Sequence, residues 1–484
     1  MSQFKLFPTF LTGCATLALL GGVPAFAGTP PATRGNNTPA KLLNSVTLEG
    51  VRGHQAVFQA IADANNGNRT SGTPGYDESV SYVAELMTDA GYDVTVQPFQ
   101  FQTFISFSPS LLVQVAPPPA GPLPNTILSY SGSGDVTAPV YLVPNLGCNA
   151  ADFAGFPAGS IALISRGACT FAIKAVNAYN AGASAVIIYN NIPGPLNGTL
   201  GNDFALDLPV VSVTQDLGLQ LAATPGLVMR VKTETFRGIA TSYNVLAETR
   251  HGDPDNVIVV GAHLDSVNAG PGIQDNGAGS AAILETALQM AGVRPKNKVR
   301  FAWWGAEEAS LVGSSYYVNN LSTEELDSIA LNLNFDTIAS PNHVFFVYDG
   351  DDSDAVGAGS GPDGSAAIER VFEDYYTMVG QPFKGTDLSG RSDYGPFIAA
   401  GIPVGGIFAG AEGIKTAEEA AIWGGVAGVQ YDPCYHQACD TYDNVNLFAL
   451  DVNADAVAYA VLQFAMNTEA VNGKRGKGNF KPRD

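Results

Sequence analysis

Short runs of apolar residues, each followed by polar or small residues, recur along the second half of the chain. Three of these runs have the length and composition of buried strands, at residues 257–262, 299–304 and 331–335. A helical pattern at residues 281–291 separates the first run from the second. Strands that alternate with helices in this way predict an open α/β sheet.

The N-terminal half adds a helix and a strand to this sheet. Val80, Val83 and Met87 recur at helical spacing, and Gly91 ends the pattern. Residues 92–96 then alternate between apolar and polar side chains, which is typical of a half-buried strand. We therefore expect this part of the chain to pack with the strands of the second half.

The segment between about residues 115 and 235 differs in character from its surroundings. A proline-rich stretch at 116–122 opens it. Only short strands and one helix follow, at residues 140–143, 161–165, 171–181, 185–189 and 210–213. Residues 242–247 then lead back into the strand that ends at His263. This order predicts a compact α/β domain, 115–235, inserted in one catalytic domain that comprises residues 41–114 and 236–467.

The two ends of the chain show no sign of belonging to either domain. A basic start at Lys5, a mostly apolar run at residues 6–20 and Ala25-Phe26-Ala27 together predict a secretory signal peptide over residues 1–27, cleaved after Ala27. Residues 28–40 lack a periodic apolar pattern, so we expect a flexible leader or propeptide there. Residues 468–484 are polar and rich in Lys and Arg, which predicts a disordered basic tail.

Composition and charge narrow the class of protein. Of the 484 residues 46% are hydrophobic, which excludes global disorder. The formal net charge of −21 repels phosphate backbones, so nucleic acid is not an expected partner. No later stretch has the uninterrupted apolar length of a membrane span, so we expect no membrane anchor after signal cleavage.

Four cysteines remain once Cys14 leaves with the signal peptide. They allow three pairings, and an exported protein favours disulfides. Proximity along the chain favours Cys148 with Cys169 and Cys434 with Cys439. A zinc cluster of all four is the alternative, although neither pair has the short spacing common in such sites.

Acids and a histidine follow the three predicted strands of the second half. Each has an ordinary explanation when taken alone: a buried histidine, a helix N-cap, a solvated pair of acids, a turn. Their joint occurrence favours a metal site, because the carboxyl ends of neighbouring strands meet at one edge of an α/β sheet. The residues concerned are His263, Asp275, Glu307, Glu308 and Asp336.

A second histidine completes a set that would suffice for two metal ions. The chain has only five histidines, and His436 lies in the loop between Cys434 and Cys439. Imidazole and carboxylate groups are the ligands that zinc takes in hydrolytic sites, and one carboxylate can bridge two ions. With one bridging acid and two further ligands for each ion, Glu307 is left free to act as a general base.

The motifs around these residues resemble the secreted two-zinc aminopeptidases, the group that includes bacterial leucine aminopeptidases and fungal vacuolar aminopeptidase. All five ligand motifs occur in the order of the family, and the similarity covers about residues 40–110 and 240–465. The motifs are His263-Leu264-Asp265-Ser266, Asp275-Asn276-Gly277-Ala278-Gly279, Trp303-Trp304-Gly305-Ala306-Glu307-Glu308, Asn334-Phe335-Asp336 and Cys434-Tyr435-His436.

This resemblance implies a role for each ligand residue. Asp275 would bridge two zinc ions, with a cis peptide bond to Asn276. His263 and Asp336 would hold one zinc, and Glu308 and His436 the other. A hydroxide between the ions would attack the substrate while Glu307 acts as the general base.

The same resemblance extends to other parts of the molecule. It implies a mixed, mostly parallel central sheet flanked by helices, and a protease-associated domain over residues 115–235. Arg391 and Tyr435 match positions that contact the substrate or its tetrahedral intermediate. Asp451 and Asp455 resemble two aspartates of a calcium site, but the acidic partner near the N-terminus has no evident counterpart, so the resemblance supports a calcium site only in part.

The sequence thus predicts a secreted, monomeric zinc aminopeptidase that removes N-terminal residues from peptides, with large apolar residues such as leucine preferred by analogy with the family. Two alternatives share the fold: a single-zinc enzyme like the glutaminyl cyclases, and a non-catalytic receptor-like binding protein. Retention of all five ligands argues against both. The glycine string at 359–364 matches a dinucleotide-binding pattern, but it does not directly follow a strand.

Overall fold

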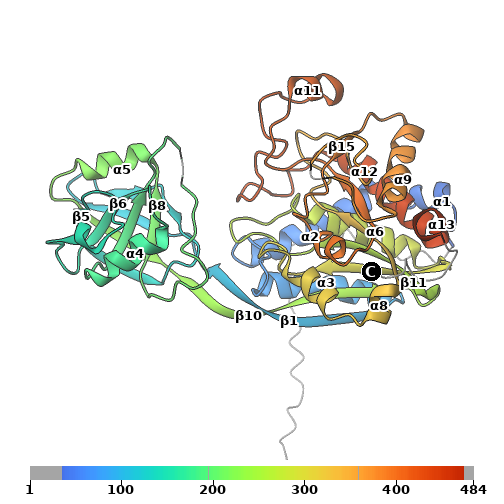
Figure 1. The fold of residues 1–484 in the computed structure, drawn as a ribbon, viewed down its shortest axis with the longest axis horizontal. Helices are drawn as coiled ribbons and strands as arrows, with labels where there is room; N and C mark the ends of the chain where they lie inside the picture. Colours follow the sequence, from blue (N-terminus) through green and yellow to red (C-terminus); the bar gives the residue numbers. More distant parts are fainter. Residues whose placement is uncertain (1–34, 195, 358, 474–484) are drawn as a thin grey trace, which may run out of the picture.

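A long two-stranded ribbon joins a larger and a smaller unit (Figure 1). The computed structural model describes residues 35–194, 196–357 and 359–473, so the predicted signal peptide lies outside the described residues. Strand β1 (Asp93–Ser106) pairs with β10 (Thr235–Glu248) in antiparallel orientation over 14 residues of each strand. The ribbon belongs to the larger unit at one end and leads into the smaller unit at the other.

The larger unit is built on a mixed sheet of eight strands in the order β1-β10-β12-β11-β13-β16-β14-β15. Strands β12, β11, β13 and β16 run parallel to one another, and antiparallel pairs occur on either side of them, between β10 and β12 and between β14 and β16. The bounds not yet given are β11 (Asp253–His263), β12 (Asn297–Trp304), β13 (Ile329–Phe335), β14 (Phe346–Tyr348), β15 (Lys384–Thr386) and β16 (Val404–Phe408).

The register of the three central strands aligns their carboxyl ends. His263 at the end of β11 pairs with Trp304 at the end of β12. On the other side Gly261 pairs with Asn334 of β13, so Asp336 lies level with His263, two residues further along. Because β12 lies on one side of β11 and β13 on the other, the order of strands reverses at β11, where open α/β sheets bind ligands.

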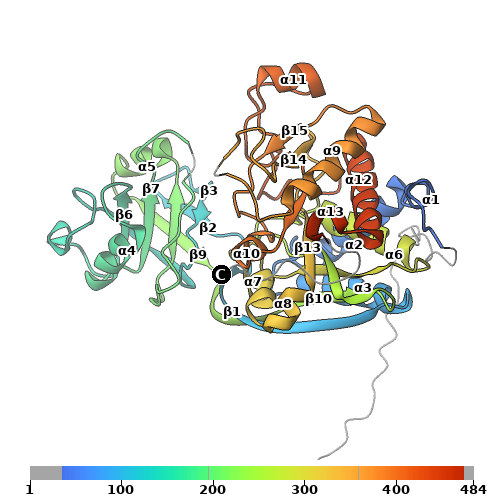
Figure 2. The ribbon, with the colours of Figure 1, turned by 45° about the vertical axis from the view of Figure 1, so that its right-hand side comes forward.

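Alternating side chains of the central strands enter two cores on opposite faces of this sheet. Ile258 and Val260 of β11 belong to the larger core, and Val257 and Val259 to the smaller one. Helices cover both faces (Figure 2). The larger core involves α1 (Pro39–Leu43), α2 (Leu48–Ala64), α3 (Pro74–Asp89), α6 (Gly277–Met290), α9 (Ser365–Val379), α12 (Leu447–Met466) and α13 (Glu469–Asn472); α7 (Val312–Asn319), α8 (Thr323–Ser328) and α10 (Gly395–Ala399) cover the opposite face.

Helix α12 is the one helix of the described residues that is long and apolar enough to cross a membrane. It packs against α1, α2, α6 and α9 instead of standing apart. Its buried residues include Leu450, Val457 and Val461. Helix α11 (Ala417–Trp423), unlike α12, lies at the periphery and projects from the top of the larger unit in both views (Figures 1 and 2).

The smaller unit contains a second eight-stranded sheet, in the order β3-β2-β9-β5-β6-β7-β8-β4. Two apolar clusters lie on its faces, one under α4 (Phe171–Asn180) and the other under α5 (Gln215–Ala222). The Cys148–Cys169 disulfide fastens a loop near the start of α4, as predicted, and Cys434–Cys439 forms in the larger unit. The remaining elements are β2 (Leu111–Ala116), β3 (Gly121–Leu123), β4 (Thr126–Ile127), β5 (Gly134–Leu142), β6 (Ile161–Ser165), β7 (Ala185–Tyr189), β8 (Val210–Val213), β9 (Val228–Thr233) and the 3₁₀ helix Ala150–Phe153.

Two predictions about the ends of the chain are wrong for the residues that the structure describes. Part of the flexible leader expected over residues 28–40 is docked, since the buried Asn36 side chain donates a hydrogen bond to the carbonyl of Gln289 at 2.9 Å and α1 begins at Pro39. The tail expected over 468–484 begins with α13. There Asn472 donates to Oδ1 of Asn256 at 2.8 Å.

The packing of α12 gives a test of the core. Leu450 is fully buried, whereas Leu447, one turn earlier on the same helix, is 49% exposed. We expect Leu450→Ala to lower the free energy of unfolding by about 2–5 kcal/mol, because it removes buried contacts and leaves a cavity. Leu447→Ala is the matched control and should change it by less than about 0.5 kcal/mol. Urea unfolding followed by tryptophan fluorescence measures both, and equal losses would contradict the assignment of α12 to the core.

Candidate metal centre

The ends of β11 and β13 bring a first group of ligand atoms together. Nε2 of His263 lies 3.2 Å from Oδ1 of Asp275 and 3.4 Å from Oδ1 of Asp336. Nδ1 of the same ring lies 3.1 Å from the carbonyl oxygen of Asp265, which can only accept a hydrogen bond. In the neutral ring the proton therefore sits on Nδ1, and the lone pair of Nε2 faces the acids, as metal-ligating histidines require.

A second group lies on the other side of Asp275. Nε2 of His436 is 3.2 Å from Oδ2 of Asp275 and 3.1 Å from Oε2 of Glu308. Each carboxylate oxygen of Asp275 thus faces a different imidazole. In both groups the candidate ligand atoms lie within 4.8 Å of one another. This is the arrangement in which one carboxylate serves two metal ions.

Unsatisfied polar atoms show that the cluster fits cations. Oδ2 of Asp275, Oε1 of Glu308 and Oδ1 of Asp336 are buried without a hydrogen-bond partner. Buried carboxylate oxygens are normally paired, so these three would gain most from a positive charge placed among them. Carboxylate and imidazole donors in groups of three suit zinc, which takes nitrogen and oxygen ligands of this kind.

The pKa values of the site reflect the same crowding of acids. Burial raises the pKa of Glu308 to about 7, and the charge of Asp275 adds to the effect. Burial also raises the pKa of Glu307 well above its ordinary value. Burial alone would lower the pKa of His263, but the charges of Asp336 and Glu307 outweigh it and raise that pKa well above the usual range. The protein part of the site therefore holds more negative charge than it can stabilise.

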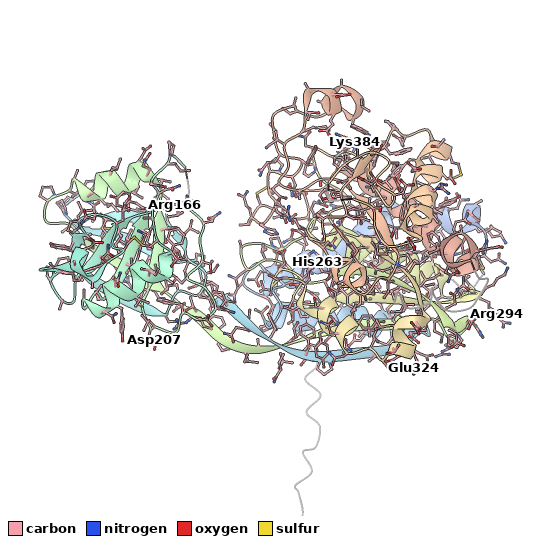
Figure 3. All side chains as sticks on the ribbon, viewed as in Figure 1. Arg166, Asp207, His263, Arg294, Glu324 and Lys384 are labelled. Carbon is pink, nitrogen blue, oxygen red and sulfur yellow. A yellow bond between two sulfur atoms is a disulfide. The ribbon has the colours of Figure 1, made fainter. Side chains whose placement is uncertain are left out.

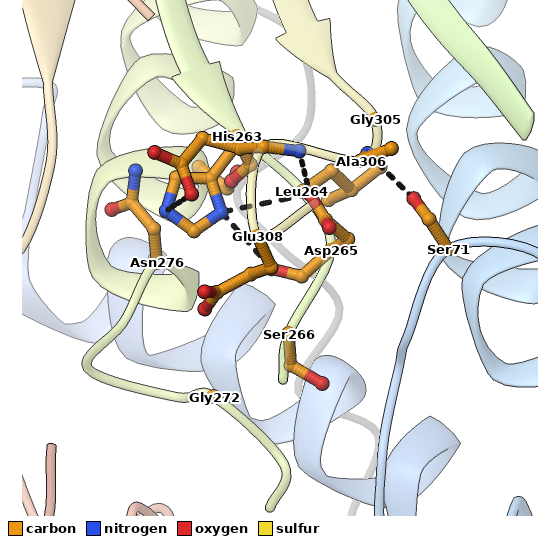
Figure 4. Close-up of polar contacts among 12 residues, drawn as sticks. Ser71, His263, Leu264, Asp265, Ser266, Gly272, Asn276, Gly305, Ala306 and Glu308 are labelled. Carbon is orange, nitrogen blue, oxygen red and sulfur yellow. Dashed lines mark hydrogen bonds and ion pairs between the residues drawn. The ribbon is translucent and has the colours of Figure 1, made fainter. Parts of the chain in front are cut away.

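The turn after β12, which carries Ala306 and Glu308, contacts the distant segment of Ser71 (Figure 4). The backbone N–H of Ala306, a residue with φ of 53°, donates to Oγ of Ser71 at 2.6 Å. The N–H of Glu307 donates to Oδ1 of Asp265 at 3.2 Å. Glu307 then lies beside the first group, with Oε2 3.9 Å from Nε2 of His263.

Two further residues orient the ligand carboxylates. The two oxygens of Asp440 accept the backbone N–H groups of Gln274 at 2.9 Å and Asp275 at 3.0 Å. Asp440 therefore ties the loop of His436 to the loop of the shared acid. Ser392 donates from Oγ to Oδ2 of Asp336 at 2.6 Å. The peptide bond between Asp275 and Asn276 is cis, as the resemblance implied.

A cavity of about 210 Å³ opens onto the cluster. Arg391 and Tyr435 both line it, together with Glu307 and Asp336. The guanidinium of Arg391 contacts Oε1 of Glu412 at 2.8 Å, and the ring of Tyr435 stacks on His436 with centroids 3.9 Å apart. Both residues thus reach the cavity from its rim.

The structure brings all eight residues singled out in the sequence to one place: His263, Asp275, Glu307, Glu308, Asp336, Arg391, Tyr435 and His436. The residues that sequence reasoning missed are those that hold the ligands, namely Ser71, Ser392 and Asp440. Ser392 directly follows Arg391, and Asp440 directly follows Cys439, so their position next to residues already singled out could have indicated a role in the site. Nothing in the sequence near Ser71 indicates such a role. Asp451 and Asp455 lie on α12, where burial raises the pKa of Asp455 to about 7.

Comparison with known proteins identifies both units. The model of peptidase family M28 matches residues 244–461, and that of the PA domain matches residues 136–221. An aminopeptidase of Pseudomonas aeruginosa is 47% identical over 453 residues, which are 90% of this chain and 84% of the relative. A probable leucine aminopeptidase 2 of Aspergillus fumigatus is 43% identical, over 84% of this chain and 80% of the relative.

Solved structures give the same result for the fold. The zinc aminopeptidase of Bacillus subtilis aligns with a TM-score of 0.60 and 26% identity, over 89% of this chain and 98% of that one. The mixed α/β sheets flanked by helices, with the smaller unit inserted in the larger, confirm the predicted fold class.

The contact made by Asp440 gives a test of how the site is held. Asp440→Asn replaces one accepting oxygen by an NH₂ group, so one N–H of the Gln274–Asp275 pair loses its acceptor. We expect the affinity for zinc to fall by roughly 10–100-fold, as for other residues that orient metal ligands. Chelator-competition titration measures it. Asp443→Asn, at an exposed acid three residues further along the same loop, is the control and should leave the affinity unchanged.

Proposed function

This chain belongs to peptidase family M28, and on that premise we propose that it is a secreted aminopeptidase that uses two zinc ions to hydrolyse the N-terminal peptide bond of peptides. The observation that carries the proposal is the position of Asp275, whose two oxygens lie 3.2 Å from the Nε2 atoms of His263 and His436. A carboxylate held between two imidazoles suits a pair of metal ions better than a single one.

In this proposal His263 and Asp336 would hold one zinc, Glu308 and His436 would hold the other, and Asp275 would serve both. Zinc, when bound, supplies Lewis acidity to the scissile carbonyl and makes water a stronger acid. The orienting contacts of Asp265, Ser392 and Asp440 keep the ligands in place without reorganisation during the reaction.

Glu307 is the proposed general base. It lies beside the ligand cluster, and neither of the two ligand groups includes it. Its carboxylate would take a proton from the attacking water and return that proton to the leaving amine. Burial raises the pKa of Glu307, which makes its carboxylate a stronger base than an exposed glutamate once a cation neutralises the neighbouring acids.

Arg391 and Tyr435 are proposed to stabilise negative charge that develops on the carbonyl oxygen. Both line the cavity that contains Glu307. The side chain of Arg391 is 70% exposed and that of its ion-pair partner Glu412 is 45% exposed, so the guanidinium can turn towards substrate at low cost. The phenol of Tyr435 is a hydrogen-bond donor at the same rim.

The cavity supports removal of single residues. At about 210 Å³ it accommodates one side chain and not a longer piece of peptide. Asp336 and Glu307 line it, and their charges suit the free amine of an N-terminal residue. Tyr348, Tyr394 and Phe408 add aromatic surface, in keeping with a preference for large apolar residues such as leucine.

The proposal also covers the organisation of the chain. Residues 1–27 act as a signal peptide, and the enzyme works outside the cell as a monomer. Residues 41–114 and 236–467 form the catalytic domain around the insertion at 115–235. Peptide N-termini are the substrates, and neither nucleic acid nor a membrane takes part. Zinc is the cofactor, and Asp451 and Asp455 retain only part of the calcium site that the resemblance implies.

Substitution of Glu307 and of Glu308, one at a time, distinguishes the role of a general base from that of a metal ligand. Glu307→Gln should retain two zinc ions per chain while kcat for leucine anilide falls by about 10²–10⁴-fold, because proton transfer is lost. Glu308→Gln should instead reduce the zinc content towards one ion. Metal analysis and steady-state kinetics measure both, with the exposed Glu324→Gln as the control. One zinc in the wild-type protein, or full activity of Glu307→Gln, would count against the mechanism.

Recognition of the free amine gives a test of exopeptidase action. N-acetylation of a leucyl peptide removes the positive charge that the acids lining the cavity would attract. We expect kcat/KM to fall by at least about 100-fold relative to the free peptide. Product analysis by chromatography measures it. Internal cleavage of the acetylated peptide would show an endopeptidase instead.

A further inference from the structure

A groove of about 760 Å³ runs between the two units and reaches the metal centre from the side of Glu308 and His436. Four segments far apart in the sequence line most of it, and one of them is the loop at residues 66–71 between α2 and α3. The other three are the loop after β11 at residues 265–269, the end of the ribbon and the turn beyond it at residues 101–110, and residues 125–129 of the insertion. The ribbon that spans the two units is visible in Figure 1, and Figure 3 shows His263 in the larger unit.

The lining of the groove is neutral except at its inner end. Of the described residues that line it, the charged or titratable ones are Asp265, Glu308 and His436, all at the metal centre. The rest of the wall combines aromatic and aliphatic side chains with small polar ones. The apolar members include Phe104, Phe107 and Ile127, and the polar ones include Ser108, Ser110, Asn125 and Ser129.

The groove and the smaller cavity meet at the ligand cluster from different sides. His436 lines both of them, whereas Glu307 and Asp336 line only the cavity and Glu308 and Asp265 only the groove. A bond cleaved at the cluster would therefore have the cavity on one side and the groove on the other. The cavity has room for one residue, and the groove has more than three times its volume.

We propose that this groove binds the uncharged, extended segment of the substrate that follows the cleaved bond, so that the insertion selects peptides over single amino-acid derivatives. The inference rests on the proposed aminopeptidase function. An extended peptide advances about 3.3 Å per residue and offers N–H and C=O groups at every step, which Ser and Asn side chains can pair. Acidic or basic segments find no charged partner along the wall and lose their hydration there.

The test uses the zinc-loaded full chain and a series of substrates of increasing length. Leucine anilide, Leu-Ala and Leu-Ala-Phe-Ala should show a rising kcat/KM for the wild-type protein. Phe107 is 53% exposed and lines the groove, so Phe107→Ala should raise KM for the tetrapeptide roughly fivefold through lost apolar contact and leave leucine anilide unchanged. Ile239→Ala is the matched control, because Ile239 is 58% exposed on the same ribbon and does not line the groove.

A negative charge introduced into the groove separates binding of the substrate there from a general structural effect of the substitution. Phe107→Glu should raise the ratio of kcat/KM for Leu-Ala-Lys-Ala over Leu-Ala-Glu-Ala by roughly threefold or more relative to wild type. The inference would be overturned if kcat/KM did not depend on substrate length, or if the Phe107 variants behaved like Ile239→Ala. Hydrolysis of leucine anilide would in that case still support the proposed function. A wild-type protein inactive on leucine anilide would overturn both. Self-association of the wild type that Phe107→Glu abolishes in light scattering would place a second copy in the groove and also overturn the inference.

Discussion

The accumulation of carboxylates around two imidazoles is the constraint on which the rest of the site depends. Asp275, Glu308 and Asp336 each leave a buried oxygen without a hydrogen-bond partner. Mutual repulsion and burial favour protonation of such acids, which the raised pKa of Glu308 expresses. A divalent cation placed among them favours the ionised form of all three. Bound zinc would therefore stabilise this arrangement of residues, in addition to what it would contribute to chemistry.

The sheet supplies the geometry that this charge requires. Because β12 and β13 flank β11, the segments that follow the three strands diverge and leave room above the end of β11. Among the candidate ligands, His263 and Asp336 lie level by strand register alone. The others depend on loops, and these loops are held by single contacts such as that of Asp440 with the N–H of Asp275. The sheet therefore fixes the positions of side chains at the strand ends, whereas side chains in the loops need additional residues that hold them in place.

This difference explains what could be predicted from the sequence. The central strands and the clustering of the acids at their ends could be predicted, because both apolar runs and strand-end acids are local patterns. The role of Ser71 was not, since its partner Ala306 lies 235 residues away and nothing local marks the pair. The docked ends escaped prediction for a related reason. Asn36 and Asn472 are fixed by side-chain hydrogen bonds to distant residues, and an isolated asparagine carries no periodic signal.

The ribbon links the insertion to the catalytic turn more closely than a simple tether would. Ser242 of β10 donates a hydrogen bond to Oγ of Ser71 at 3.0 Å, and Ser71 accepts the N–H of Ala306. Asn244 of the same strand accepts the N–H of Gly305 at 3.1 Å. Strand β10, which connects the insertion to the larger unit, therefore also positions the turn that contains Glu307 and Glu308. A movement of the ribbon at this end would displace Glu307, so the groove wall and the proposed base share one rigid support.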